Sequence, residues 1–320
     1  MIVTVTANTT LDHILFVPSF AFNKTLRARD VLVTIGGKPT DASWILGEMG
    51  IPSLALGFAA GHVGQQVEEI LQEKGVVTDF IQVDGESRRN ILVMSEDGQG
   101  EVTITFSSLQ VSEAHVAALR DRYVRALDDA TGVVIGGTLP HTISPAFYTE
   151  FIRLARERSI PVIFDAGEPN LSAGLISRPT YVKPNRDELT ALIGEPIISM
   201  EDAYHAGRTI LERFGTIPVI SLGGDGGLAV LPDCAYHIPP IPVNIASTAG
   251  AGDAVLAGLA YAIVRNEPLE TALRVGFGAA AAVCTMPGTA QCRRADIEYF
   301  TQQVQLVPYT PAMEQIHDAV

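Results

Sequence analysis

The run Ile245-Ala246-Ser247-Thr248-Ala249-Gly250-Ala251-Gly252-Asp253 leads directly into the apolar stretch Ala254–Gly258. Its small residues let backbone N–H groups approach a ligand closely, and the apolar stretch predicts a buried helix. The first N–H groups of a helix have no internal partner and carry partial positive charge, so they suit a phosphate. Asp253 falls in the first turn. A carboxylate there would repel a bound phosphate, so its presence points to a chemical role, such as accepting a proton from an attacking hydroxyl. The alternative is an ordinary helix start, at which the helix dipole favours Asp.

Length and composition limit the classes of protein to consider. The chain has 320 residues, of which 47% are hydrophobic and 18% charged, with a formal net charge of −14. This length allows one large α/β domain or two smaller ones, and the composition argues against disorder. The negative charge makes nucleic acid and anionic membranes poor partners. An anionic sugar phosphate would need a local basic pocket.

The cysteines and the apolar runs predict a cytoplasmic protein. Cys234, Cys284 and Cys292 form no Cys-x-x-Cys pair, so a reducing compartment is expected rather than a disulfide scaffold or a zinc site. The N-terminus lacks a basic start and is expected to form a strand, not a signal peptide. The longest apolar runs, Ala254–Val264 and Val275–Met286, fall short of the ~20 residues that span a bilayer.

Alternating apolar segments and turn residues predict an α/β protein. From residue 112 onward, helical and strand patterns follow one another. In parallel α/β sheets, ligands collect at the carboxyl ends of the strands, so polar residues that follow a strand are candidates for the site. The main predicted strands are Ile2–Thr6, Ser53–Phe58, Val133–Ile135, Pro161–Asp165 and a segment around Val219–Ser221.

Several short polar motifs follow these strands, and each also has an ordinary structural explanation. Asp12 ends the motif Asn8-Thr9-Thr10-Leu11-Asp12 and could be a turn residue. Asn185 with Glu188 would form a capping box in any protein, and the glycines of Gly223–Gly227 would suit a hairpin turn. The loop Gly36-Gly37-Lys38-Pro39-Thr40-Asp41 is not a Walker A loop, because no Ser or Thr follows its lysine.

Taken together, these motifs resemble those of the PfkB/ribokinase family of carbohydrate kinases, in the same order from Asp12 to Thr289. Gly250–Asp253 is similar to the family's Gly-Ala-Gly-Asp signature, and Lys183–Glu188 is similar to its Lys-Pro-Asn-x-x-Glu. The resemblance implies a ribokinase-like α/β/α sandwich with a mostly parallel central sheet and a small β-strand lid, in a single domain over 1–320. Two segments, about 12–36 and 86–107, would form the lid.

The resemblance implies roles for residues on both sides of Asp253. Asp253 would be the general base, and the backbone N–H groups of Gly250, Ala251 and Gly252 would hold the transferring charge. Residues expected to bind the sugar phosphate are Asp12, Lys24, Gly36, Gly37, Lys38, Asp41, Arg88, Asn90 and Thr138. Residues expected to bind the nucleotide are Lys183, Asn185, Ser221, Gly223, Gly226 and Gly288. Asn185 and Glu188 would also hold Mg²⁺ through water.

The reaction that the resemblance implies is in-line phosphoryl transfer from MgATP to a sugar hydroxyl. The matches at Lys24, Arg88 and Asn90 favour the sugar-phosphate branch, which includes phosphofructokinases and tagatose-6-phosphate kinase. Arg88 and Arg89 point to opposite faces of a strand, so at most one should face the substrate. A homodimer formed through the lid is a further expectation. Dependence on a monovalent cation stays open, because Ser247 stands where ribokinase-like members have an Asp ligand.

The loop Gly36–Asp41 is similar to the loop in which the family binds its sugar, and it is called the sugar loop below. It departs from the family pattern at two positions. Pro39 replaces a Gly and Asp41 replaces an Asn. Pro suits the first helical position, so the backbone is expected to survive the first change. An ionised Asp only accepts hydrogen bonds, so Asp41 is expected to accept from a sugar hydroxyl remote from the substrate phosphate. The alternative is that Asp41 merely caps the helix that starts nearby.

Functions of other classes remain as alternatives. One is a kinase for an unphosphorylated sugar, of the ribokinase or fructokinase type. Because Pro39 and Asp41 alter the sugar loop, another is a non-catalytic sensor of a sugar phosphate or a nucleotide. The presence of Asp253 argues against a sensor, which needs no base. A dehydrogenase is disfavoured, because no Gly-x-Gly-x-x-Gly follows the first strand.

Overall fold

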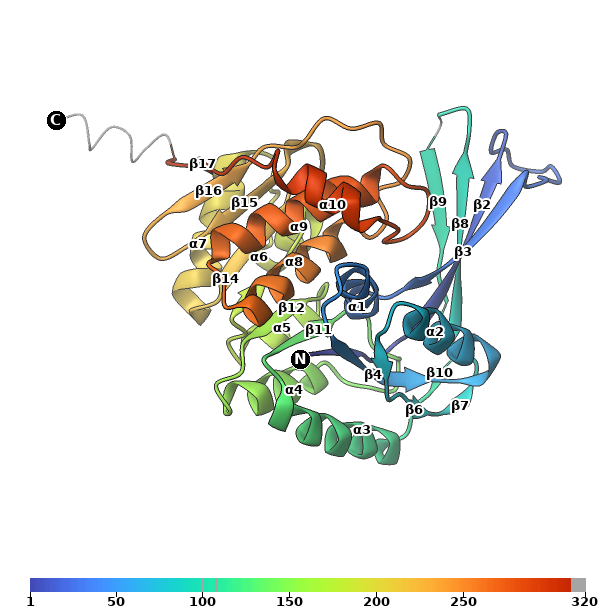
Figure 1. Ribbon diagram of the computed structural model, residues 1–320, viewed down its shortest axis with the longest axis horizontal. Coiled ribbons are helices and arrows are strands. Elements are labelled where there is room, and N and C mark those ends of the chain that lie inside the picture. Colours follow the sequence, from blue (N-terminus) through green and yellow to red (C-terminus); the bar gives the residue numbers. More distant parts are fainter. Residues whose placement is uncertain (99, 107–108, 312–320) are drawn as a thin grey trace.

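A large twisted sheet runs through the body of the molecule (Figure 1), in a computed structural model that describes residues 1–98, 100–106 and 109–311. Its order is β17-β16-β15-β14-β13-β12-β11-β1-β4-β5, with β6 also paired to β4. Neighbours from β14 to β5 pair in parallel, and those from β14 to β17 pair antiparallel. The strands are β1 (Ile2–Thr6), β4 (Ser53–Ala59), β5 (Val77–Thr78), β6 (Ile81–Gln82), β11 (Gly132–Gly136), β12 (Val162–Asp165), β13 (Tyr181–Val182), β14 (Ile217–Ser221), β15 (Gly227–Val230), β16 (Ala235–Ile238) and β17 (Val307–Pro308).

Helices cover both faces of this sheet, as predicted for an α/β/α sandwich. Successive strand residues point to opposite faces, so Ile2 and Val134 lie in one core whereas Val3 and Val133 lie in the other. The first core is closed by α1 (Lys38–Glu48), α2 (Gly61–Glu73), α8 (Ala251–Arg265), α9 (Leu269–Cys284) and α10 (Arg294–Thr301). The second is closed by α3 (Glu113–Ala126), α4 (Ala146–Arg156), α5 (Asn170–Leu175), α6 (Arg186–Ile193) and α7 (Met200–Phe214). Two short 3₁₀ turns are η1 (Leu127–Asp129) and η2 (Gly223–Asp225).

The parallel register brings the carboxyl ends of the central strands to one edge of the sheet. Thr6 pairs with Gly136, and Gly136 pairs with Asp165, so the last residues of β1, β11 and β12 lie side by side. The segments that follow these strands therefore gather at the same edge. This is the edge at which ligands collect in α/β sheets.

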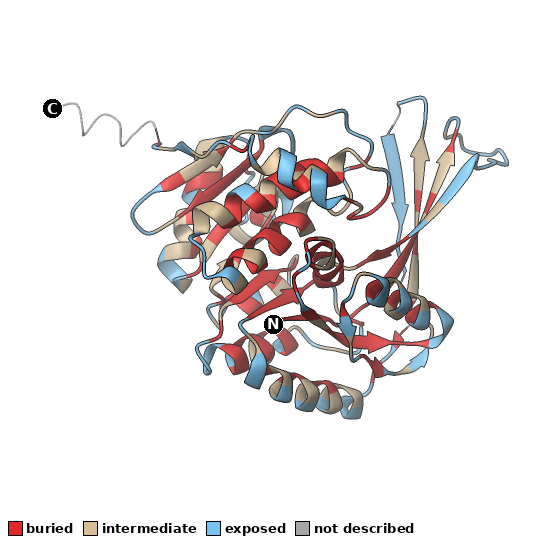
Figure 2. Cartoon of the chain, viewed as in Figure 1, coloured by how far each residue is buried: buried red, intermediate tan, exposed pale blue. Residues whose placement is uncertain are grey.

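A separate four-stranded sheet forms a lid that projects beyond the sandwich (Figure 1). Its order is β3-β2-β8-β9, with β2 (Thr10–Val17), β3 (Asp30–Gly36), β8 (Arg88–Ser95) and β9 (Gly100–Ile104). The lid thus combines strands from the two predicted segments, of which residues 99 and 107 lie outside the described part of the chain. Figure 2 shows that β9 is exposed along its length at the lid's edge. Two short strands, β7 (Asp84–Gly85) and β10 (Leu109–Gln110), pair below the lid.

Some element boundaries differ from those predicted. The strand predicted over Val133–Ile135 is longer by one residue at each end and forms β11 over Gly132–Gly136. The strand predicted over Pro161–Asp165 begins one residue later, because β12 covers Val162–Asp165. In the described ranges, no helix combines the length and apolarity required for a membrane crossing.

Candidate active site

The first turn of α8 forms the centre of the candidate site. Gly250 is the N-cap residue and has a φ of 82°, a left-handed conformation that favours glycine. A Cβ at this position would lie 2.4 Å from the backbone nitrogen of Ala290. The Ala251 N–H donates to the carbonyl of Thr248 at 3.2 Å. Among the described groups of this turn, the N–H groups of Gly250 and Gly252 are therefore better placed than that of Ala251 to hold an anion.

Gly250→Ala is expected to destabilise the fold by about 3 kcal/mol or more, because it combines left-handed strain with a backbone clash. Gly194→Ala is a matched control, since Gly194 has a φ of 84° and nothing within 4 Å of its added Cβ. The control should lose only about 1–2 kcal/mol from the strain. Urea unfolding of both variants measures the difference. Equal losses would show that the contact with Ala290 does not constrain this turn.

A network of opposite charges surrounds Asp253. Asp165, at the end of β12, is 1% exposed and receives the ammonium groups of both Lys38 and Lys183. The Lys183 Nζ lies 2.9 Å from Asp165 Oδ2, and a Cβ on Gly252 would lie 3.2 Å from the same Nζ. Lys38 also donates to Glu188 Oε1 at 2.8 Å. The network therefore links the sugar loop, the strand ends and α6 beneath the first turn of α8.

This network sets the protonation of the central carboxyl groups. Burial, with a contribution from the nearby charge of Asp165, raises the pKa of Asp253 to about 6, against the effect of Lys38 and Lys183. Burial would also raise the pKa of Asp165, but Lys183 and Lys38 hold it below its ordinary value. Asp253 can therefore exchange a proton near neutral pH, whereas Asp165 stays ionised.

Lid residues and the sugar loop converge on the other side of Asp253. Asp12 is buried and accepts from Asn90 Nδ2 and from Thr289 Oγ1, both at 2.8 Å. The charge of Arg88 lies close enough to lower the pKa of both Asp12 and Asp41, against the effect of burial. In the lid register Arg88 pairs with Thr10 and Arg89 with Leu11, so the two arginines face opposite sides, as predicted.

Buried polar atoms in this group have no hydrogen-bond partner within the described part of the chain. They are Oδ1 of Asp41, Oδ1 of Asn90, Nε of Arg88 and Oδ1 of Asn8. Asn8 also donates to the exposed Thr138 hydroxyl at 3.2 Å. Buried polar groups in folded proteins are normally satisfied, so this cluster suits a ligand with many hydroxyl groups.

The structure contradicts the alternative that Asp41 caps its helix. The N-cap of α1 is Gly37, and no side chain caps it. Pro39 lies in the first turn, where its missing N–H removes no helical hydrogen bond, so the altered loop keeps its backbone. Gly36 lies against Asp12, since a Cβ there would be 2.6 Å from Asp12 Oδ1. Close packing at Gly36 thereby places the loop beside Asp12.

A cavity of about 580 Å³ opens on the opposite side of the α8 start. Its lining includes Asn185, Ser221, Gly223, Gly226, Thr248, Ala251, Gly252, Phe277 and Cys284. Gly226 is required for the turn, because its φ is 82° and an added Cβ would lie 2.0 Å from the Ile238 carbonyl oxygen. A larger hollow of about 780 Å³ near Pro242 contains one charged side chain, Arg274, which bonds to a backbone carbonyl. Of these two cavities, the first reaches Gly252, the residue before Asp253, and its size and apolar walls suit a nucleotide base.

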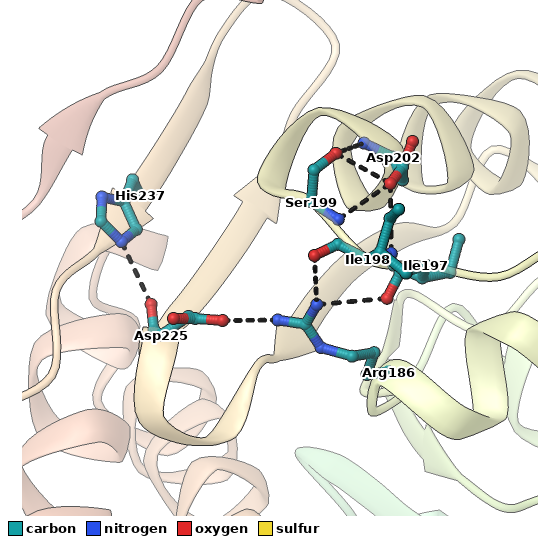
Figure 3. Close-up of polar contacts among 7 residues, drawn as sticks. All are labelled: Arg186, Ile197, Ile198, Ser199, Asp202, Asp225 and His237. Carbon is teal, nitrogen blue, oxygen red and sulfur yellow. Dashed lines mark hydrogen bonds and ion pairs between the residues drawn. The ribbon is translucent and has the colours of Figure 1, made fainter.

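Arg186 fixes the rim of this cavity (Figure 3). Its guanidinium donates to the carbonyls of Ile197 and Ile198 at 3.1 and 2.9 Å and to Asp225 Oδ2 at 2.6 Å. The carbonyl of Asp225 lies 3.2 Å from Nε2 of His237. The glycine turn between β14 and β15 is therefore held from α6 on one side and from β16 on the other.

Asn185 and Glu188 form the predicted capping box at the start of α6. Asn185 Oδ1 accepts from the Glu188 N–H at 2.8 Å, and Glu188 Oε2 accepts from the Asn185 N–H at 2.9 Å. With Oε1 bonded to Lys38, both Glu188 oxygens have protein partners. The described residues contain no group of three or more His, Cys, Asp or Glu side chains that could hold a metal. These residues thus fit a Mg²⁺ ion held mainly by phosphate oxygens and water rather than a protein cage.

Two predicted site residues lie apart from this arrangement. Lys24 is exposed in the loop between β2 and β3, at the far end of the lid (Figure 1). Gly288 packs beside Leu32 and Thr34 of β3, on the lid side, and does not line the nucleotide-sized cavity. Sequence reasoning did not single out Asp165 or Arg186. Asp165 carried one signal, since it is an acid at the carboxyl end of a buried strand.

The chain is similar to known sugar kinases over almost its whole length. It is 28% identical to a 1-phosphofructokinase of Bacillus subtilis, over 95% of this chain and 97% of the relative. It is 27% identical to a tagatose-6-phosphate kinase of Staphylococcus epidermidis, over 86% and 89%. A solved Escherichia coli phosphofructokinase-2, in complex with substrates and products, superposes with a TM-score of 0.87 at 25% identity, over 94% and 98%. Since the model of the pfkB family carbohydrate kinases matches residues 2–296, the chain belongs to that family.

Proposed function

We propose that this kinase transfers the γ-phosphoryl group of ATP to a hydroxyl of a ketose phosphate, of the fructose phosphate or tagatose 6-phosphate type. The observation that supports this most directly is the position of Asp253. It lies between a cavity sized for a nucleotide and a cluster of unpartnered polar groups suited to a sugar. The relatives named 1-phosphofructokinase and tagatose-6-phosphate kinase act on substrates of this class by name.

In the proposed step, Asp253 accepts the proton of the sugar hydroxyl. The hydroxyl oxygen forms a bond to the γ-phosphorus, and the bond between that phosphorus and the bridging oxygen of ADP breaks. The N–H groups of Gly250 and Gly252, at the positive end of the α8 dipole, stabilise the charge on the transferring group. Lys183, next to Gly252, adds a fixed positive charge. Positioning and electrostatic stabilisation supply most of the rate in such reactions.

The cofactors follow from the same geometry. ATP would occupy the cavity beside Ser221, Gly223 and Gly226, with its phosphates toward Gly252. Bound Mg²⁺ would neutralise phosphate charge, held by water that bonds to Glu188 and Asn185. A monovalent cation is not part of the proposal.

The phosphorylated sugar is favoured over a free sugar by Arg88. Its guanidinium is partly buried on the inner lid face, and its Nε has no partner among the described residues. A free sugar gives such a cation no counter-charge, whereas a substrate phosphate does. The test is ADP release with a panel of free and phosphorylated ketoses and aldoses. Turnover confined to ketose phosphates supports the proposal, and turnover confined to free sugars or absent with all of them rejects it.

We further propose a homodimer formed through the outer lid face. The side chains of Val31, Val33, Val102 and Ile104 all lie on the lid face opposite Asp12 and are between 41% and 53% exposed. Contiguous exposed apolar patches on a soluble protein commonly mark an interaction surface. A second copy of the same flat sheet presents the same apolar patch, so the two faces suit each other.

Ile104→Glu is expected to convert the dimer to a monomer, because it places a charge in the apolar interface. Sedimentation at micromolar concentration measures the outcome. Val77→Glu is a matched control, since Val77 is 59% exposed on β5 of the main sheet, away from the lid. A monomeric wild-type chain, or a dimer that persists in Ile104→Glu, would reject the lid interface.

A further inference from the structure

Two carboxyl groups meet where α1 and α8 begin. Asp41 lies in the first turn of α1 and is 2% exposed. Helix α1 packs against α8, and the carboxyl group of Asp41 lies within hydrogen-bonding reach of that of Asp253, in the first turn of α8. A carboxylate accepts hydrogen bonds but has none to donate. The bond between the two groups therefore requires that they share one proton.

The surroundings decide which of the two carries that proton. Asp253 faces the negative charge of Asp165 at the end of β12, but also the cations of Lys38 and Lys183 and the positive field of the α8 N-terminus. Asp41 faces the carboxyls of Asp253 and of Asp12 on β2, and the guanidinium of Arg88 on β8 offsets them only in part. The proton is therefore more stable on Asp41, and Asp253 stays the acceptor.

We propose that Asp41 is a neutral acid whose O–H donates to Asp253 and orients it, so that Asp41 is a positioning residue for the base. This inference rests on the proposed role of Asp253 as the base. The neutral form explains how an Asp replaces the amide that the family pattern has at this position. A protonated carboxyl has an O–H donor and a carbonyl acceptor, so it offers the same two kinds of group as the NH₂ and carbonyl of Asn.

Burial and electrostatics agree with this assignment. Burial, together with the charges of Asp253 and Asp12, raises the pKa of Asp41 well above its ordinary value. Oδ1 of Asp41 is buried without a described partner, so it remains free to accept from a sugar hydroxyl. A neutral Asp41 also removes the repulsion that an ionised side chain would exert on a substrate phosphate. The expectation that Asp41 is ionised is thereby revised, and the expected contact with a sugar hydroxyl is kept.

The first test measures the proton without turnover. Asp41 is expected to hold its proton in the folded chain and lose it in the unfolded chain. The unfolding equilibrium constant of the wild type should therefore rise about tenfold per pH unit relative to Asp41→Asn above about pH 5, until the pH at which Asp41 ionises in the folded chain. Asp121→Asn, at an exposed position on α3, is the control and should show no such slope. A difference between wild type and Asp41→Asn that is constant with pH would show that folded Asp41 is ionised, and would overturn the proposal.

The second test compares the shapes of pH–rate profiles. In the wild type, kcat/KM should fall on the alkaline side as Asp41 ionises and the donor to Asp253 is lost. Asp41→Asn keeps a neutral donor at every pH, so its profile should lack that fall. An alkaline fall that is identical in both proteins would overturn the positioning role. If the unfolding difference depends on pH but the chain shows no kinase turnover, the shared proton stands and the proposed function is rejected.

Discussion

Asp253→Asn is expected to lower kcat by about 10²- to 10⁴-fold, the usual contribution of a general base. The substitution keeps the size of the side chain and removes its negative charge and its capacity to accept a proton. Nucleotide binding should remain, because the cavity is formed by backbone and by other side chains. Initial rates at saturating ATP and sugar phosphate, with nucleotide affinity from calorimetry, measure both quantities.

Two further measurements separate a base from an ordinary acid at a helix start. Glu113→Gln removes an exposed acid from the first turn of α3 and should leave turnover unchanged. In the wild type, kcat/KM should fall as the pH drops below about 6, because Asp253 accepts a proton only when it is ionised. Turnover of Asp253→Asn within a few-fold of the wild type would eliminate Asp253 as the base.

Arg88→Met is expected to raise the KM for the sugar phosphate by about ten- to a hundred-fold. A charge-assisted hydrogen bond to phosphate contributes about 1.5–3 kcal/mol, which gives this range. The KM for ATP should change much less, since Arg88 lies on the lid and does not line the nucleotide-sized cavity. Steady-state kinetics with each substrate varied in turn measure both constants.

The neighbouring arginine provides the control for this prediction. Arg89 follows Arg88 in β8 but faces the other side of the lid sheet, so Arg89→Met should leave the sugar-phosphate KM nearly unchanged. Equal effects of the two substitutions would indicate a general loss of positive charge instead of a specific contact.

The parts of the site that the sequence predicted are those set by local pattern. The small residues before Asp253 predict a helix start, and strand alternation assigns Arg88 and Arg89 to opposite faces. Polar residues that follow parallel strands gather at the same edge of the sheet, even when the loops between them differ. For this reason Asp12 could be placed near Asp253. The α/β/α sandwich and the family were predicted correctly because several motifs resemble those of the family in the same order along the chain.

The parts that could not be predicted depend on contacts between distant segments. Thr289 bonds to Asp12 across 277 positions of sequence, and no local pattern specifies that pair. Asp165 resembles any acid at a strand end until Lys38 and Lys183 are seen to converge on it. The shared proton of Asp41 depends on the packing of α1 against α8, so the sequence supported only an ionised side chain there.

Phosphoryl transfer to a sugar that already carries a phosphate can be seen in the products. They are identified by mass spectrometry and ³¹P NMR after incubation with MgATP and a ketose phosphate, beside the corresponding free ketose. We predict a ketose bisphosphate formed mole for mole with ADP, and little product from the free ketose. Equal phosphorylation of the free ketose, or ADP release without a bisphosphate, would contradict the claim.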